Sequence, residues 1–79
     1  MKYRIVMKMC SNQKEAEKML ATVKDKARSP FVNYNNNTRS WYVVLSEVDG
    51  RDKADEAYSW FRSKGLQIFI HNMAGDNNE

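Results

Sequence analysis

The sequence predicts one α+β domain whose elements follow the order strand, helix, strand, strand, helix, strand. Two observations predict this order. Apolar and polar residues alternate near both ends of the chain, over residues 3–9 and 66–71, as they do in strands with one buried face. Two intervening stretches, residues 13–27 and about 52–64, carry apolar residues at helical spacing. A chain of 79 residues has room for only one such domain.

The first strand and the first helix are marked by alternation and by a capping pattern. One side of the strand carries Tyr3, Ile5, Met7 and Met9, and the other carries Arg4, Val6 and Lys8. Asn12, followed three residues later by Glu15, has the spacing of a capping box and predicts the helix start. The apolar stripe of this helix comprises Ala16, Met19, Leu20, Val23 and Ala27.

A hairpin is predicted next. Ser29 and Pro30 end the helix, and residues 31–34 form a short strand for which a leading proline is acceptable. The asparagines at 35–37 predict a turn, because asparagine tolerates left-handed backbone angles. The following strand, Ser40 to Ser46, is expected to be buried on much of both faces because its centre is Trp41, Tyr42, Val43, Val44 and Leu45.

The second helix follows a turn at Asp49 and Gly50. Its apolar stripe comprises Ala54, Ala57, Tyr58 and Phe61. Gly65 is typical of the residue that follows a helix end. In the last strand, Leu66, Ile68 and Ile70 alternate with Gln67, Phe69 and His71.

Right-handed crossovers between these elements place both helices on one face of a four-stranded antiparallel sheet of order 4-1-3-2, the ferredoxin-like arrangement. We expect residues 1–72 to form this domain and residues 73–79 to form a flexible tail. The predicted sheet contribution to the core is Ile5, Met7, Trp41, Val43, Leu45, Ile68 and Ile70.

The sheet face opposite the helices is the candidate binding surface. It is predicted to present Arg4, Val6, Lys8, Tyr42, Val44 and Phe69. An apolar centre flanked by cations favours a macromolecular partner, and we expect Val6, Tyr42 and Val44 to be accessible to solvent. An ordinary surface and a homodimer through the same face are the alternatives. Trp60, which lies off the helical stripe, is a secondary candidate, with packing at the helix edge as its alternative.

The residues that catalysis and cofactor binding require are scarce. One Cys10 and one His71 cannot form a zinc site of the usual kind, and the three glycines are isolated rather than grouped in a phosphate-binding loop. We therefore expect no enzymatic activity, cofactor or metal. We also expect a cytoplasmic protein that binds no membrane, because the sequence has no signal peptide, no long apolar span and no disulfide framework.

Charge is distributed unevenly along the chain. Residues 1–40 carry nine Lys and Arg against three Asp and Glu, a net charge of +6. Residues 41–79 carry four against seven, a net charge of −3. The basic half favours an anionic partner, and an ordinary solvated surface is the alternative.

Several segments resemble the SPOR domain, a bacterial module that binds peptidoglycan strands lacking stem peptides. Residues 3–7 are similar to its opening Y-x-V-Q-L strand, and residues 11–17 to its S-N-x-x-x-A-E helix entry. Residues 41–48 are similar to Y-R-V-R-V-G-P-F, and residues 51–70 to its closing helix and strand. The resemblance implies the predicted fold and glycan binding. The chain departs from the family's polar and glycine positions at Val6, Lys8, Tyr42, Val44 and Ser46.

Three functions remain open on the sequence. The first is a protein-binding modulator or inhibitor of the kind found among compact accessory proteins of phages and mobile elements. The second is binding of RNA or single-stranded DNA as in an RRM, for which Tyr42 is the one available stacking residue on the two central strands. The third is the glycan binding that the SPOR resemblance implies.

Overall fold

The computed structural model describes residues 1–73, which form two helices and one four-stranded antiparallel sheet. The elements are β1 (Lys2–Met7), α1 (Gln13–Val23), β2 (Phe31–Asn35), β3 (Ser40–Asp49), α2 (Arg51–Ser63) and β4 (Ile68–Asn72). The strand order is β2-β3-β1-β4, which is the predicted order read from the other edge. The arrangement is consistent with a ferredoxin-like fold. Most of the predicted tail, residues 74–79, lies outside the described residues.

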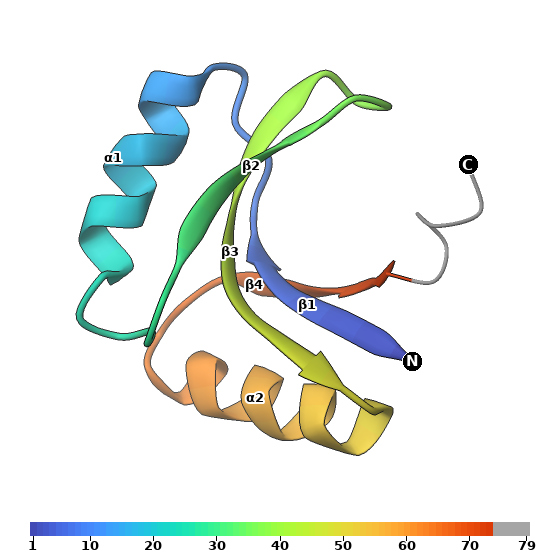
Figure 1. Cartoon of the computed structure of the whole chain (residues 1–79). Helices are drawn as coiled ribbons and strands as arrows, with labels where there is room; N and C mark the ends of the chain where they lie inside the picture. Colours follow the sequence, from blue (N-terminus) through green and yellow to red (C-terminus); the bar gives the residue numbers. More distant parts are fainter. Residues whose placement is uncertain (74–79) are drawn as a thin grey trace.

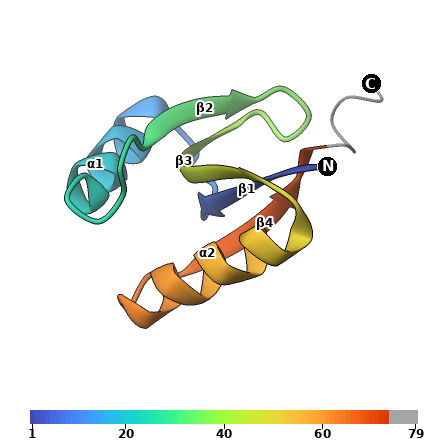
Figure 2. The same ribbon diagram turned by 60° about the horizontal axis from the view of Figure 1, so that its bottom comes forward.

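The sheet is curved, and both helices lie on its outer side (Figure 1). Helix α1 packs over β2 and β3, and α2 packs over β1 and β4. The β2–β3 hairpin and the free ends of β1 and β4 border the inner side of the curve, which faces away from the helices (Figures 1 and 2). We call this inner side the concave face.

The main core lies between the helices and the outer side of the sheet. Its buried residues are Ile5, Val23, Val43, Leu45, Phe61 and Ile68. Met7 and Ile70 are partly buried against this cluster, so the predicted strand faces are confirmed at six positions. The prediction that Trp41 belongs to this core is wrong, because Trp41 lies outside the cluster. Its ring packs instead against Tyr34, with ring centroids 4.9 Å apart.

The helix boundaries follow local hydrogen bonds. The Asn12 side chain accepts a hydrogen bond of 2.9 Å from the Glu15 backbone, so the predicted cap is confirmed. Helix α1 ends at Val23 and not at Ala27, because the backbone N–H groups of residues 26 and 27 both bond to the Val23 carbonyl in a closing turn. Ala27 still packs against the core, which explains why its position matched the helical stripe.

Helix α2 ends in a Schellman motif, and this delays the last strand. Gly65, at φ +84°, donates to the Arg62 carbonyl, while Leu66 donates to the Phe61 carbonyl. Because Leu66 is used in ending the helix, β4 begins at Ile68 and not at residue 66. At the same end of the sheet, β1 stops at Met7, which pairs with Ile68, and Met9 is 42% exposed.

No helix among the described residues is long and apolar enough to span a membrane.

Candidate functional site

One row of side chains crosses the concave face from edge to edge. The strand register pairs Phe31 with Val44, Val44 with Val6, and Val6 with Phe69. Arg4 and His71 form the neighbouring pair of β1 and β4. The structure therefore brings Arg4, Val6, Val44 and Phe69 together on one face, as the alternation of the sequence indicates.

The exposure predicted for the centre of this face is wrong. Val6, Tyr42 and Val44 are only 5%, 3% and 0% exposed, and they form a second buried cluster. Neither α1 nor α2 covers them. The curvature of the sheet brings side chains of neighbouring strands over them instead. A register shift between Ile5 and Val6 increases this curvature, because such bulges bend a strand.

Arg4 is one of these covering side chains. Its guanidinium carbon lies 5.6 Å from the centroid of the Phe31 ring. Phe31 is on the edge strand beyond β3, so the Arg4 side chain must extend across β3 to reach it. The long aliphatic part of arginine commonly covers apolar surface in this way.

Two phenylalanines of this row, one on each edge strand, remain open to solvent. Phe31 is 42% exposed and Phe69 is 57% exposed. Both belong to the row that crosses Val44 and Val6. The concave face thus has a closed aliphatic centre with an exposed phenylalanine on each side.

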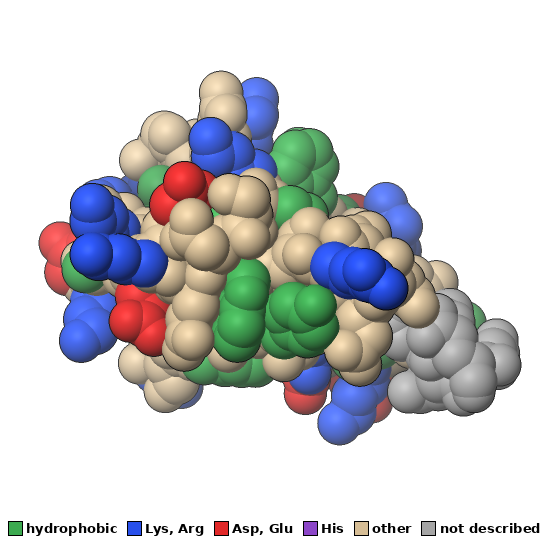
Figure 3. All heavy atoms as spheres, turned by 90° about the horizontal axis from the view of Figure 1, so that it is seen from above, with side chains coloured by type: hydrophobic (Ala, Val, Ile, Leu, Met, Phe, Trp, Pro, Cys, Tyr) green, Lys and Arg blue, Asp and Glu red, His purple; other side chains and the backbone are tan. Residues whose placement is uncertain are grey.

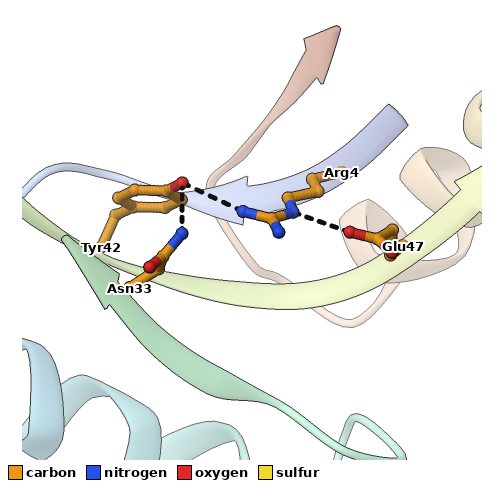
Figure 4. Close-up of polar contacts among 4 residues, drawn as sticks. All are labelled: Arg4, Asn33, Tyr42 and Glu47. Carbon is orange, nitrogen blue, oxygen red and sulfur yellow. Dashed lines mark hydrogen bonds and ion pairs between the residues drawn. The ribbon is translucent and has the colours of Figure 1, made fainter. Parts of the chain in front are cut away.

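A polar network lies above this centre (Figure 4). Arg4 Nε donates to Glu47 Oε2 at 2.9 Å, and an Arg4 terminal nitrogen donates to the Tyr42 hydroxyl at 3.3 Å. Asn33 Nδ2 donates to the same hydroxyl at 3.1 Å. Because a hydroxyl has two lone pairs and one hydrogen, Tyr42 keeps its own hydrogen for a further acceptor.

The network also fixes two charges. Partial burial disfavours the charged form of Arg4, but the hydrogen bonds to Glu47 and Tyr42 outweigh it and raise the pKa of the guanidinium. The hydrogen bond from Arg4 holds the pKa of the Glu47 carboxyl below its ordinary value. Arg4 and Glu47 therefore remain charged and neutralise each other near pH 7.

A hollow of about 280 Å³ opens beside this network. It is lined by Arg4, Tyr42, Asn33, Tyr34, Asn35, Asn36, Asn37 and Met73. The Asn35 side chain accepts from the backbone N–H groups of residues 37 and 38 and so holds the hairpin turn. The lining is rich in amide groups, which both donate and accept hydrogen bonds.

The remaining predicted site residues lie elsewhere. Lys8 is exposed and follows the end of β1. Trp60 is 50% exposed on α2, where its ring contacts Phe61 edge-on and the Lys64 ammonium lies 5.0 Å from its centroid.

Viewed from above, the face in Figure 3 has charged side chains gathered over α1 and hydrophobic side chains in its middle.

Sequence reasoning missed Phe31, Asn33, Glu47 and the asparagines of the hairpin. The signal for the first two was available. Val32 packs against the main core, so alternation places its neighbours Phe31 and Asn33 on the concave face. Alternation could not place Glu47 on the concave face, because the register shift in β3 alters which residues share a face.

Within residues 1–73, no group of three His, Cys, Asp or Glu side chains is placed to hold a metal ion. Comparisons with protein-family models, with curated proteins and with solved structures find no match to this chain.

Proposed function

We propose that this chain is a non-catalytic protein-binding module that modulates or inhibits its partner through the concave face. The observation that carries the proposal is the pair of exposed phenylalanines, Phe31 and Phe69, on either side of a closed aliphatic centre. Phenylalanine, tyrosine, methionine and arginine are enriched in protein interfaces. All four residue types line this face, at Phe31, Tyr42, Met73 and Arg4.

The polar network supports the same proposal. Arg4 is held by Glu47 and by Tyr42, so it presents a fixed guanidinium and loses little conformational freedom on binding. Preorganised aromatic and arginine side chains are the usual energetic centres of protein interfaces. Cys10 is unpaired and buried, which supports action in a reducing compartment such as the cytoplasm.

Two observations disfavour nucleic-acid binding as in an RRM. Tyr42, the predicted stacking residue, is 3% exposed, so a base can stack on it only after the second cluster has been opened. Arg4 is already neutralised by Glu47 and is therefore a weak attractor for phosphate.

Glycan binding is a second candidate, and the amide-lined hollow favours it. Asn33, Asn36 and the Tyr42 hydroxyl in its lining offer donors and acceptors suited to sugar hydroxyls. The hollow is smaller than most ligand sites, which usually measure about 300–1,000 Å³. We therefore place it second.

The test is retention of proteins from nuclease-treated extract of the native cell on the immobilised chain. We expect a discrete protein to be retained by the unmodified chain and lost with the Phe31→Asp, Phe69→Asp double variant. Trp60→Asp is the matched control, because Trp60 has similar exposure but lies on α2.

Three results would overturn the proposal. Retention that depends on Trp60 and not on the phenylalanines would move the binding site to α2. A species that is retained from untreated extract but not from nuclease-treated extract would favour nucleic acid. Retention of the chain on purified peptidoglycan, abolished by Asn33→Ala, would favour the glycan candidate.

A further inference from the structure

The outer edge of β2 has backbone groups that a further strand can use. β2 pairs with β3 on one side, and no strand within residues 1–73 pairs with its other side. The strand itself, Phe31–Asn35, contains no Lys, Arg, Asp, Glu or proline. An extended segment of another protein can add to a sheet edge of this kind through main-chain hydrogen bonds.

The hydrogen bonds of Trp41 identify the residues that face this edge. Its N–H donates to the Cys10 carbonyl at 2.9 Å, and its carbonyl accepts from the Cys10 N–H at 2.6 Å. The backbone groups of Trp41 therefore point away from β2, and its partner Tyr34 is in a pair without hydrogen bonds. Because the register of β2 with β3 is unbroken, the N–H and C=O groups of Val32 and Tyr34 both point out of the sheet at this edge.

An exposed aromatic side chain lies on each side of the same edge strand. Phe31 is exposed on the concave face. Tyr34 is exposed on the outer side, because alternation places it on the side where Val32 packs against the main core. A strand added beside β2 contacts Phe31 with one set of its side chains and Tyr34 with the alternate set. This favours a segment that has apolar residues on both of its faces.

Charge favours an acidic segment. Lys24, Lys26 and Arg28 precede β2 with one acidic residue, Asp25, among them, and Arg39 follows β2 in the hairpin turn. Within residues 1–73, none of these four cations forms an ion pair. A five-residue strand is only roughly 17 Å long, so cations lie near both of its ends. They attract carboxylates and repel the same cations of a second copy, which disfavours pairing of β2 with itself.

We propose that β2 binds an extended acidic segment of the partner protein as an added strand. The segment pairs with the backbone of Val32 and Tyr34, and its Asp or Glu residues lie at both ends of β2. Pro30 limits the pairing at the start of the strand, because it has no N–H to donate. The inference rests on the proposed protein-binding function and specifies the form in which the partner is bound.

Selection of short peptides from a random display library on the immobilised full chain, under reducing conditions, provides the probe. We expect the enriched peptides to carry β-branched and aromatic residues between Asp or Glu residues. The enriched peptides are then synthesised, and their affinity for the chain is measured by calorimetric titration. Affinity should fall as salt is raised, because the flanking charges are exposed.

Tyr34→Pro tests the backbone pairing. It removes the N–H that faces the edge and leaves the hydrogen bonds between β2 and β3 in place, and an edge strand accepts proline at such a position. Tyr34→Val is the matched control, because it also lacks the ring but keeps the N–H. We expect Tyr34→Pro to bind the peptide at least about tenfold more weakly than Tyr34→Val.

Amide hydrogen exchange of the unmodified chain gives a second measurement that does not depend on how well the proline variant folds. The peptide should slow exchange of the Val32 and Tyr34 N–H groups and leave exchange in β4 unchanged.

Charge reversal tests the acidic character of the segment. Arg28→Glu, Arg39→Glu should weaken peptide binding at least about tenfold. Lys53→Glu, Arg62→Glu is the matched control, because it changes the net charge equally but on α2, which packs over β1 and β4. This control should leave binding nearly unchanged.

Four results overturn the inference. They are the absence of enriched peptides, enrichment of peptides that lack Asp and Glu, equal binding by Tyr34→Pro and Tyr34→Val, and unchanged exchange at Val32 and Tyr34. Peptide binding that Phe69→Asp abolishes but Tyr34→Pro does not affect overturns this inference and leaves the proposed function in place. Binding that depends on the Tyr34 N–H and not on Phe69 supports the added strand and limits the binding surface to the β2 side of the sheet.

Discussion

The two faces of the sheet reach the same burial by different means. On the outer face, Val43 is 0% exposed beneath helices that pack on it. On the concave face, Val44 is also 0% exposed, yet neither α1 nor α2 covers it, and side chains of the sheet such as Arg4 do so. Curvature can therefore close an apolar centre that neither α1 nor α2 covers. A face without helices is therefore not equivalent to a face open to ligands.

The largest effect is expected from charge placed in either centre. Val43→Asp and Val44→Asp should both unfold the protein, because an unpaired buried carboxylate costs several kcal/mol, a large part of the stability of a small domain. Circular dichroism in a thermal melt measures this. A folded Val44→Asp protein with an unchanged melting temperature would show that the concave centre is open after all.

A gentler truncation separates the two centres. Val43→Ala should cost about 2–3 kcal/mol and Val44→Ala about 1–2 kcal/mol, because side chains such as Arg4 can settle into the smaller cavity more readily than whole helices can. Urea denaturation measures both values. A Val44→Ala cost equal to or larger than that of Val43→Ala would mean that the concave centre is as rigid as the main core.

Tyr42→Phe tests the polar cover of the concave centre. It removes the hydroxyl that accepts from both Arg4 and Asn33, while it keeps the buried ring. We expect a loss of about 1 kcal/mol, since two partly buried donors lose one protein acceptor but can be reached by water. The Tyr34→Phe variant is the control, because Tyr34 is 39% exposed and its ring contact is unaffected.

The smallest effect concerns the Arg4–Glu47 ion pair. The pKa of Glu47 is lowered in the folded protein from its ordinary value of 4.5, so its contribution to stability is present above that value and is lost as pH falls through the lowered pKa. The Glu47 side chain is 38% exposed, so we expect a contribution below about 1 kcal/mol. Urea denaturation of Glu47→Gln near pH 7 and near pH 3 should show a flatter pH dependence than the unmodified chain.

Much of the fold could be predicted because it depends on patterns within single elements. Alternation identified the two faces of β1 and β4, and the Asn12 cap and Gly65 located helix ends close to where they lie. Trp41 was placed in the main core by the same alternation, but it lies one residue from the start of β3, where its ring meets Tyr34 instead. Alternation reports the side of a sheet and not what covers that side.

The candidate site was harder to predict, because its form depends on relations between strands. The register shift between β1 and β3 cannot be recognised from the alternation of apolar and polar residues around Ile5 and Val6. Because the curvature of the sheet was not known, neither the burial of Val44 nor the contact of Arg4 with Phe31 could be predicted. Phe69 was correctly placed on the concave face because its neighbours Ile68 and Ile70 pack on the other side.

The pairing of the first and last strands determines how the domain responds to force. Tyr3 lies opposite Asn72, so a pull applied to the two ends of the chain acts on the same end of the β1–β4 ladder. In antiparallel strands loaded in this way, the hydrogen bonds open one after another instead of sharing the load. The domain should therefore yield to weak tension by peeling of β4. A protease that pulls the chain in from its carboxyl end would therefore reach β4, the strand that peels most easily, first.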